Sequence, residues 1–397
     1  MENINGYIKT CPFIQSIINS NRNDSIPVIV SLKSEKAYNK SNVATLSKRI
    51  KYELPIVNGF ACDMNIQQIK KFYTHEDIDF ISYDSRIHSI INKAGKTIGV
   101  DKISSIPLTG KGITVAMIDT GIIMHRDLTY PSNRIVGFKD FLKNKQKPYD
   151  DNGHGTHISG LVASNGISSK GKYKGIAPEA NILSVKALDY EGNGKVSDIL
   201  SAIQWVIQTK NTFKTRILNL SLGTAAQYSE RFDPLVKAAN KAIENGIIVV
   251  TAVGNNGPNP KSILSPSTSR HVISVGACDD RKESDGSNLT IPSFSSRGPT
   301  RDRVKKPDLL APGVDIVSLS NTDVAGYSSL TGTSMSAPIV SGVVALMLQE
   351  KPNMTHFEAK KRLIENCTRI GLSQYDEGAG VLSLNKLFSI VSKEATK

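Results

Sequence analysis

The chain has 397 residues, of which 39% are hydrophobic and 21% are charged. This length and composition are typical of a globular protein with about two domains, and no apolar run approaches the roughly 20 residues that a membrane-spanning helix needs. The net charge of +13 is spread along the whole chain, and its densest cluster, at 301–306, is short. Because no nucleic-acid-binding motif accompanies that charge, we expect neither a nucleic-acid nor a membrane partner.

The cysteines and the N-terminus indicate the compartment. Cys11, Cys62, Cys278 and Cys367 are widely scattered, and they have neither the spacing of a disulfide framework nor that of zinc ligands. Residues 1–24 contain no long apolar core followed by a small-residue cleavage site, which a secretory signal would show. We therefore expect a cytoplasmic protein, with unconventional export left open.

The first 92 residues predict a small α+β domain. Residues 1–25 are polar and rich in asparagine, which indicates a loosely held extension. Residues 26–92 combine short apolar runs with amphipathic segments, and a linker containing lysine and glycine follows at 92–96. Strands are expected at 27–32, 54–57, 59–64 and 78–83, and helices at 44–52 and 66–73.

Residues 93–397 are expected to form one larger domain, because strand-like runs alternate there with helical patterns. Continuous Val- and Ile-rich runs between helices are typical of a parallel sheet covered on both faces. The expected fold class is therefore a doubly wound α/β fold with a mostly parallel sheet, in which function collects at the carboxyl ends of the strands. Strands are expected at 113–118, 182–187, 217–222, 247–253 and 272–277, and helices at 154–164, 196–209, 234–244 and 334–350.

A candidate nucleophile lies in the stretch 331–338. Glycine and hydroxyl residues lead there into an apolar pattern with helical spacing, so we expect a buried helix to begin near Ser334, with Pro338 in its first turn. Ser334 would then lie at the positive end of the helix, where a developing oxyanion is stabilised. An N-cap serine is the common alternative.

Further polar residues lie at strand ends or helix starts. Asp119 ends the first apolar run of the larger domain, His154 lies between two glycines at a helix start, and Asn255 follows the fourth apolar run. Each also has a structural interpretation as a turn or capping residue. His157, one turn after His154, raises the alternative of a metal site. Because the pair lacks the glutamate of a helical zinc peptidase, we expect no metal there.

Together these residues fit the chemistry of a serine nucleophile. A serine hydroxyl is a weak nucleophile at neutral pH and needs an adjacent base. A neutral imidazole such as that of His154 can serve, and a carboxylate such as Asp119 on the other ring nitrogen would fix its tautomer and stabilise the imidazolium. The amide of Asn255 and the backbone N–H of Ser334 would hold the oxyanion.

The chain resembles the subtilisin-like serine peptidases over nearly all of residues 100–390. Any one matching segment is only suggestive, but together and in the family's order the segments are highly specific. The matching segments are 116–121, 152–157, 218–223, 294–300, 306–313 and 332–338. The resemblance implies that Ser334 is the nucleophile, His154 the general base and then acid, Asp119 the orienting carboxylate and Asn255 the side-chain oxyanion donor.

The resemblance also implies how substrate and inhibitor would bind. Ser221, Leu222 and Gly223 match the strand that pairs with an extended substrate backbone. The N-terminal domain is similar to the family's small inhibitory pro-domain, which assists folding and then blocks the cleft with its C-terminal strand, and self-cleavage is expected within 83–96. The partners implied are protein or peptide substrates and the pro-domain itself.

No cofactor is needed for this chemistry, but related enzymes often hold structural calcium. Asp127 matches one family calcium ligand by its position after Gly121. The loop 165–173, where relatives often hold the ion, carries no carboxylate here, and Ca²⁺ prefers several oxygen ligands. The loop sequence therefore does not support calcium. Leu264, in the segment after Asn255, hints at a shallow apolar pocket for the side chain before the scissile bond.

We therefore expect a serine endopeptidase that hydrolyses peptide bonds through an acyl-enzyme and is made as a self-processing zymogen. The alternative is a catalytically silent scaffold of the same fold with a binding or regulatory role, because a fold alone does not prove a function.

Overall fold

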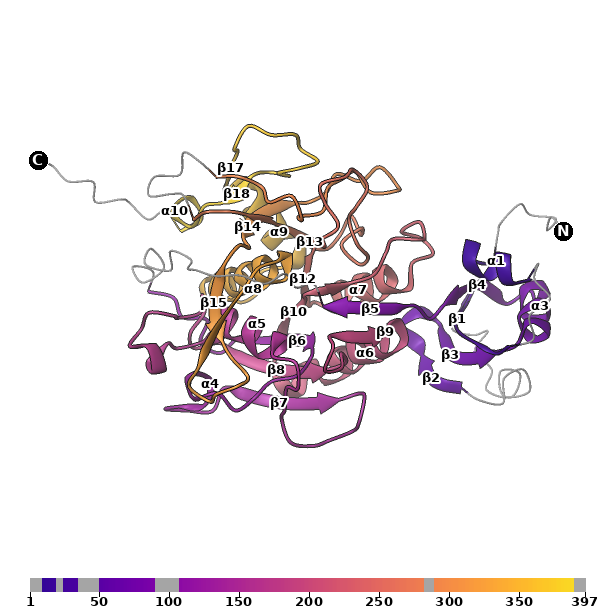
Figure 1. The fold of residues 1–397 in the computed structure, drawn as a ribbon, viewed down its shortest axis with the longest axis horizontal. Helices are drawn as coiled ribbons and strands as arrows, with labels where there is room; N and C mark the ends of the chain where they lie inside the picture. The colour runs from indigo at the N-terminus through magenta and orange to yellow at the C-terminus, as the bar shows by residue number, and fades with distance from the viewer. Residues whose placement is uncertain (1–8, 19–23, 35–49, 90–106, 282–288, 389–397) are drawn as a thin grey trace, which may run out of the picture.

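The computed structural model describes residues 9–18, 24–34, 50–89, 107–281 and 289–388 (Figure 1). A small N-terminal domain, at the right of Figure 1, adjoins a larger domain whose first strand begins at Thr114. The predicted linker at 92–96 lies outside the described residues.

The small domain is an antiparallel sheet with two helices on one face. Strand β1 (Ile26–Leu32) lies between β3 (Gly59–Met64) and β4 (Ile78–Tyr83), and β2 (Ile50–Leu54) pairs with the other edge of β3. Helices α1 (Pro12–Ile18) and α3 (Ile66–Thr74) contact each other and β4.

Side chains of β1 alternate between two hydrophobic cores, as the geometry of a strand requires. Val28 and Val30 lie with Phe60 in the small domain's own core, whereas Ile29 and Ala61 pack with residues of the larger domain. The small domain therefore buries both faces of its sheet, one under its own helices and the other against its neighbour.

Three expectations for this domain were wrong. Residues 12–18 are not part of a loose extension, because α1 buries Ile14 and Ile17 at helical spacing. The last residues of the predicted helix at 44–52 belong to strand β2, and positions 44–49 lie outside the described residues. The predicted strand at 54–57 is instead the 3₁₀ turn η2 (Pro55–Val57), since a proline has no amide hydrogen for strand pairing.

The larger domain is built on a nine-stranded sheet in the order β17-β18-β14-β13-β12-β10-β6-β8-β7. All of its strand pairs are parallel except β17 with β18. This confirms the expected α/β class. The strands are β6 (Thr114–Asp119), β7 (Ile135–Asp140), β8 (Asn181–Lys186), β10 (Thr215–Leu220), β12 (Ile248–Ala252), β13 (Ile273–Cys278), β14 (Leu309–Pro312), β17 (Cys367–Thr368) and β18 (Val381–Leu382).

Helices cover both faces of this sheet (Figure 1). In β6, Val115 and Met117 face the core shared with α5 (His154–Ala163), α8 (Thr333–Glu350) and α9 (His356–Glu365). Ala116 and Ile118 face the core shared with α6 (Val196–Phe213) and α7 (Pro234–Glu244). Both faces of β6 are therefore apolar, and the polar residues that follow it emerge only at its carboxyl end.

The remaining elements are short. They are β5 (Arg86–Ser89), α4 (Arg126–Thr129), η4 (Ile167–Ser169), β9 (Asn193–Lys195), β11 (Leu222–Gly223), β15 (Ile316–Leu319), β16 (Tyr327–Leu330) and α10 (Leu384–Leu387).

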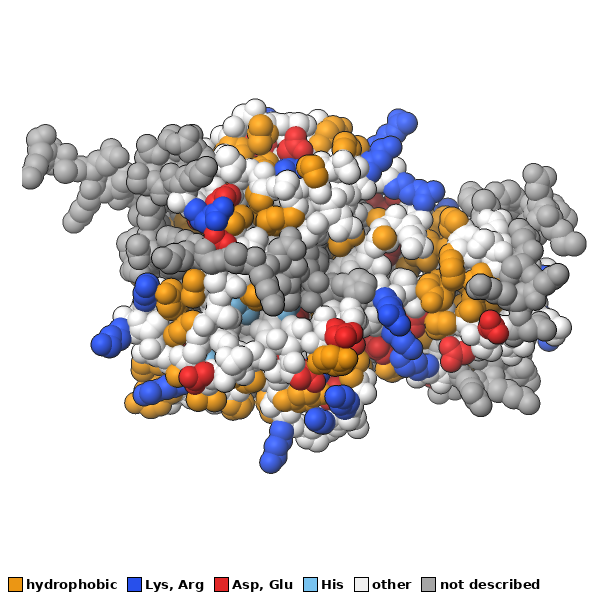
Figure 2. Space-filling model, viewed as in Figure 1, with side chains coloured by type: hydrophobic (Ala, Val, Ile, Leu, Met, Phe, Trp, Pro, Cys, Tyr) orange, Lys and Arg blue, Asp and Glu red, His pale blue; other side chains and the backbone are white. Residues whose placement is uncertain are grey.

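On the face shown in Figure 2, basic side chains are scattered rather than gathered in one patch. Within the part of the chain that the structure describes, no helix combines the length and hydrophobicity needed to cross a lipid bilayer.

Candidate active site

Asp119 and His154 form a buried pair at the carboxyl edge of the sheet. Asp119 is the last residue of β6 and His154 the first of α5, and 2.6 Å separate Oδ1 of the aspartate from Nδ1 of the imidazole. Both residues are only 1% exposed. Among the described residues, the other ring nitrogen of His154, Nε2, is buried without a hydrogen-bond partner. The pair therefore leaves one nitrogen free to exchange a proton.

Glycines allow the helix to approach the strand end so closely. A Cβ on Gly155 would lie 2.2 Å from the carbonyl oxygen of Gly121, so no side chain fits at this contact. Gly121 and Gly153 also adopt φ values of +119° and +107°, which other residues rarely adopt. The glycines that flank His154 thus determine where the imidazole lies.

Ser334 is the second residue of α8 and is fully buried. Its hydroxyl donates a hydrogen bond of 3.0 Å to the carbonyl of Ser221, and the Ser221 hydroxyl donates one of 3.0 Å to the carbonyl of Ser334. Helices α5 and α8, which carry His154 and Ser334, pack against each other. The Ser334 hydroxyl is nevertheless not bonded to His154, because Nε2 has no partner in the described part of the chain.

Pro338 lies deeper in the helix than expected. We predicted it in the first turn, but α8 begins at Thr333, which puts Pro338 in the second turn. A proline cannot donate to the carbonyl four residues earlier, which here belongs to Ser334. That carbonyl is therefore available to the hydroxyl of Ser221, so the proline helps to join the helix of Ser334 to the segment that leads into strand β11.

Asn255 follows β12 and is held by Thr333. Its Oδ1 accepts hydrogen bonds of 3.0 Å from both the backbone N–H and the hydroxyl of Thr333. Among the described residues, Nδ2 of Asn255 is buried without a partner. The amide is thus oriented through its oxygen, and its N–H₂ group remains available as a donor. We did not predict this contact of Thr333 with Asn255, although Thr333 directly precedes Ser334.

The strand formed by Leu222 and Gly223 is already paired with a segment of the same chain. In the antiparallel register, Leu222 lies opposite Ser89 and Gly223 opposite His88. On its other side, β5 pairs antiparallel with β9. Strand β5 of the N-terminal domain therefore fills the space between β11 and β9, in the middle of a three-stranded sheet. We did not predict the contribution of β9, a three-residue strand between a turn at 190–192 and the start of α6.

The side chain of Ile87 points into the larger domain. It is fully buried and belongs to the same hydrophobic core as Val196, Ile199 and Leu222. The side chain of Leu264 packs closely against two glycines, since Cβ atoms added to Gly223 and Gly254 would approach it within 3.0 Å and 2.5 Å. Leu264 is therefore an apolar neighbour of the paired strand.

His157 and Asp127 are both used structurally. His157 is fully buried, its Nε2 lies 3.0 Å from the carbonyl of Ile316, and burial lowers its pKa to about 3, which keeps the ring neutral. No cluster of three or more metal-binding side chains occurs within the described ranges. His157 is therefore a packed neighbour of His154.

The carboxylate of Asp127 is surrounded by hydrogen-bond donors. It accepts bonds from the Tyr327 hydroxyl at 2.6 Å, the Ser164 hydroxyl at 2.8 Å and the backbone N–H of Ser168 at 2.9 Å. These hydrogen bonds lower the pKa of Asp127 against the opposing effect of burial. Arg134 donates to its backbone carbonyl. Calcium needs about six to eight oxygen ligands, and a carboxylate occupied by donors beside a guanidinium does not fit such a site.

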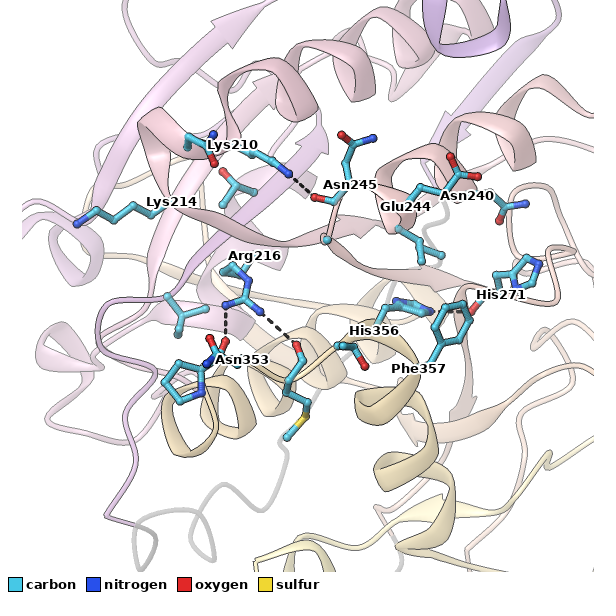
Figure 3. A pocket seen from close by; sticks show the side chains of 18 of the residues that line it. Lys210, Lys214, Arg216, Asn240, Glu244, Asn245, His271, Asn353, His356 and Phe357 are labelled. Carbon is cyan, nitrogen blue, oxygen red and sulfur yellow. Dashed lines mark hydrogen bonds between the residues drawn. The ribbon is translucent and has the colours of Figure 1, made fainter.

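A large cavity lies at the opposite edge of the sheet (Figure 3). Its volume is about 1060 Å³, and it is lined by the first residues of β10, the ends of α6 and α7 and the start of α9. The guanidinium of Arg216, which lines the cavity, donates hydrogen bonds to the carbonyls of Pro352 and Met354. Neither Asp119, His154 nor Ser334 lines this cavity, so it is separate from the candidate active site.

Comparison with known sequences agrees with this geometry. The sequence profile of the Subtilase family matches residues 110–382. This chain belongs to the subtilase family. Serine protease AprX of Bacillus subtilis (strain 168) is 46% identical over 278 residues, which are 66% of this chain and 62% of AprX. Subtilisin DY of Bacillus licheniformis is 34% identical over 292 residues, which are 72% of this chain and 94% of that protein.

The fold of this subtilase is also found in a solved structure. Fervidolysin from Fervidobacterium pennivorans, described as a keratinolytic enzyme related to subtilisin, superposes with a TM-score of 0.72 at 21% sequence identity. The match covers 93% of this chain and 62% of fervidolysin, so the subtilase spans less than two thirds of both fervidolysin and AprX. Family and relatives together identify the larger domain as a subtilase domain.

Proposed function

We propose that Asp119, His154 and Ser334 are the catalytic triad of this subtilase. The observation that carries the proposal is the buried 2.6 Å contact between Asp119 and Nδ1 of His154, at the start of a helix that packs on the helix of Ser334. A carboxylate in this position fixes the tautomer of the imidazole and stabilises its protonated form. Nε2 then serves as the base that a serine hydroxyl requires.

In the proposed reaction, the Ser334 hydroxyl first turns from the Ser221 carbonyl toward His154. Oγ attacks the carbonyl carbon of the scissile peptide bond while its proton moves to Nε2, and the carbonyl electron pair moves onto oxygen. Collapse of this intermediate breaks the C–N bond, and His154 returns the proton to the leaving amine. A water molecule then repeats the sequence on the acyl-enzyme and releases Ser334.

Asn255 is proposed as the side-chain donor to the oxyanion. Its Nδ2 is buried and unpartnered among the described residues, while Thr333 holds the oxygen end of the amide. A donor that is oriented before the reaction stabilises developing charge without reorganising. The backbone N–H of Ser334, near the start of α8, is the proposed second donor.

The replacement Ser334→Ala tests this assignment. It should abolish hydrolysis of a general protein substrate and labelling by a fluorophosphonate probe, because only an activated serine reacts with such a probe. The melting temperature of the variant should stay close to that of the parent protein. Activity or labelling that persists in the purified variant would refute the triad and favour the silent-scaffold alternative.

We also propose that the N-terminal domain is a pro-domain that inhibits the protease. The support is strand β5, which occupies the position between β11 and β9 that an extended substrate would take. Strand addition to an exposed edge is a general mode of peptide recognition. As long as β5 remains there, a protein substrate cannot pair with Leu222 and Gly223.

The register of β5 suggests where self-cleavage occurs. Ser89 lies opposite Leu222, the residue after Ser221, and the carbonyl of Ser221 accepts a hydrogen bond from the Ser334 hydroxyl. We therefore expect cleavage shortly after Ser89, within the range 83–96 given above. N-terminal sequencing of the purified protein tests this, and Ser334→Ala should remain uncut. A mature N-terminus upstream of β5 would contradict the inhibitory role.

Substrates are proposed to be extended peptide segments with an apolar side chain at the position of Ile87. That side chain is enclosed by the core around Val196, Ile199 and Leu222. Two peptide substrates that differ only at this position test the proposal. Replacing isoleucine by aspartate should lower kcat/KM roughly 10- to 100-fold, since a charged group cannot be buried there without a partner. Equal rates for both peptides would exclude this subsite.

A further inference from the structure

The carboxylate of Asp150 accepts hydrogen bonds from several polar groups at the start of α5. Asp150 is 6% exposed and lies four residues before His154. It touches neither Asp119 nor His154 directly, yet its two oxygens receive donors from both flanking segments. The donors are the Thr120 hydroxyl at 2.9 Å, the backbone N–H groups of Asn152 at 3.1 Å, Gly153 at 2.8 Å and Thr156 at 2.9 Å, and the Thr156 hydroxyl at 2.7 Å.

Thr120 connects this carboxylate to the strand of Asp119. Its backbone N–H donates to Oδ1 of Asp119 at 2.8 Å, the same oxygen that contacts His154. Its hydroxyl donates to Asp150 and accepts the backbone N–H of Gly155 at 2.9 Å. One side chain thus links the end of β6 to the first turn of α5.

The charged surroundings of the link are few. Lys186 is fully buried, and its Nζ donates to the carbonyl of Thr120 at 2.6 Å and to the carboxylate of Asp151 at 2.5 Å. The positive charge of Lys186 therefore neutralises Asp151, and the same ammonium group holds the Thr120 carbonyl by a hydrogen bond. The hydrogen-bond donors to Asp150, in contrast, are neutral. The Asp119–His154 pair lies at the other end of the link.

We propose that Asp150, acting through Thr120, is a positioning residue that sets the contact between Asp119 and His154. This inference rests on the triad proposed above. Asp150 holds the first turn of α5 by the N–H groups of Gly153 and Thr156, and it holds the strand end by Thr120. Any change in the separation of these two segments alters the 2.6 Å contact directly. Small displacements of catalytic groups are costly, about 100-fold in rate for roughly 1 Å.

An ordinary helix cap would behave differently, and the chain contains a matched example. Asp233 caps α7, is 3% exposed, and accepts the backbone N–H groups of Leu235 and Val236 at 3.0 and 3.2 Å. Its hydrogen bonds reach none of the proposed triad residues. Replacing either aspartate by asparagine keeps the shape and removes the charge, so Asp233→Asn reports the loss of a buried cap alone.

The test compares Asp150→Asn with Asp233→Asn in the self-processed protein that is obtained from the full chain. The amide introduced by Asp150→Asn would offer one acceptor oxygen and would turn an N–H₂ group toward donors, which disrupts the link. We expect kcat to fall roughly 10- to 100-fold with KM within about twofold. The acid limb of the kcat/KM profile should move to lower pH, because a displaced carboxylate favours the protonated imidazole less. Asp233→Asn should change the melting temperature and leave kcat and the pH profile unchanged.

A second pair of variants covers the case in which Asp150→Asn does not fold. Thr120→Val removes the hydroxyl at constant shape, whereas Thr120→Ser keeps it, so the first should show the same kcat loss and pH shift and the second should restore both. An unchanged pH profile and kcat in Asp150→Asn or Thr120→Val would overturn the inference. An inactive parent protein would instead overturn the proposed triad, so the two failures are distinguishable.

Discussion

Phe80 of the N-terminal domain stacks on Phe232 of the protease domain, with ring centroids 4.9 Å apart and an angle of 21° between the planes. Tyr228 also contacts the Phe80 ring, edge-on, with 5.8 Å between the ring centroids. Both partners belong to the segment between β11 and α7, directly after the strand that pairs with β5. The aromatic contact therefore holds the proposed inhibitor beside the site that it blocks.

Replacing Phe80 by alanine should weaken the inhibition. Buried aromatic anchors typically contribute at least about 2 kcal/mol to an interface, which corresponds to roughly a 30-fold change in affinity. The measurement is the protease activity immediately after self-cleavage, which should be higher and should rise with a shorter lag. Phe13→Ala is the control, because that ring contacts Tyr83 within the small domain. Equal behaviour of the two variants would show that Phe80 is not an anchor.

The inhibitory contact should also depend on pH through Asp84. This buried carboxylate of the small domain accepts the N–H of Ser197 at 2.9 Å and its hydroxyl at 2.5 Å, and so caps α6. Burial raises the pKa of Asp84; the two Ser197 hydrogen bonds and Lys51 oppose this rise, and Asp198 adds to it. Docking therefore favours the protonated form.

It follows that the contribution of Asp84 to binding should be greatest at acidic pH. A raised pKa in the docked state contributes binding below the ordinary value of 3.8, and this contribution is lost as the pH rises through the docked pKa. The variant Asp84→Asn has no ionisable carboxyl at this position. The ratio of the residual inhibition of the parent to that of the variant should therefore change between pH 3.8 and the raised pKa of docked Asp84. If both proteins show the same pH dependence, Asp84 does not control release.

Asn255→Leu should remove the proposed oxyanion donor. We expect kcat to fall roughly 100- to 1000-fold, the loss known for a side-chain oxyanion donor in a subtilisin, with KM nearly unchanged. Steady-state kinetics on a peptide substrate measure this. The neighbouring Asn256 is exposed, so Asn256→Leu is a suitable control. A loss expressed in KM alone would assign Asn255 to substrate binding.

Chelation of divalent ions should leave the melting temperature and the activity unchanged. The carboxylate of Asp127 is already occupied by Tyr327, Ser164 and Ser168, which replace a cation by hydrogen bonds. Thermal unfolding with EDTA and with added calcium tests this. Asp127→Asn should lower stability by about 1–3 kcal/mol, because it leaves buried donors unsatisfied. A clear rise in melting temperature with calcium would contradict this prediction.

Local pattern was sufficient for most of the larger domain. The run Val115–Ile118 is apolar on both faces, and such a run between helices specifies a buried parallel strand. Asp119 was expected at a strand end and His154 at a helix start between two glycines, and the structure has both there. The short helix α1 was missed, because seven residues within a polar segment carry too little periodic signal.

Other features depend on contacts between distant segments. The local sequence of Asp150 is typical of a turn residue. Only the approach of α5 to the end of β6 makes its carboxylate the common hydrogen-bond acceptor for both segments. Likewise, the resemblance implied that the N-terminal domain blocks the cleft, but nothing near Arg86–Ser89 indicates that this strand also pairs with β9.

Residue order along the chain was thus enough to specify the α/β fold and to nominate an acid, an imidazole and a serine, because hydrophobic periodicity and turn chemistry are short-range properties. Three matters were decided by long-range packing: the buried contact of Asp119 with His154, the orientation of the Ser334 hydroxyl toward Ser221, and the pairing of β5 with both β11 and β9. Each joins segments separated by tens of residues or more, whose meeting depends on the free energy of the whole fold and not on any local preference.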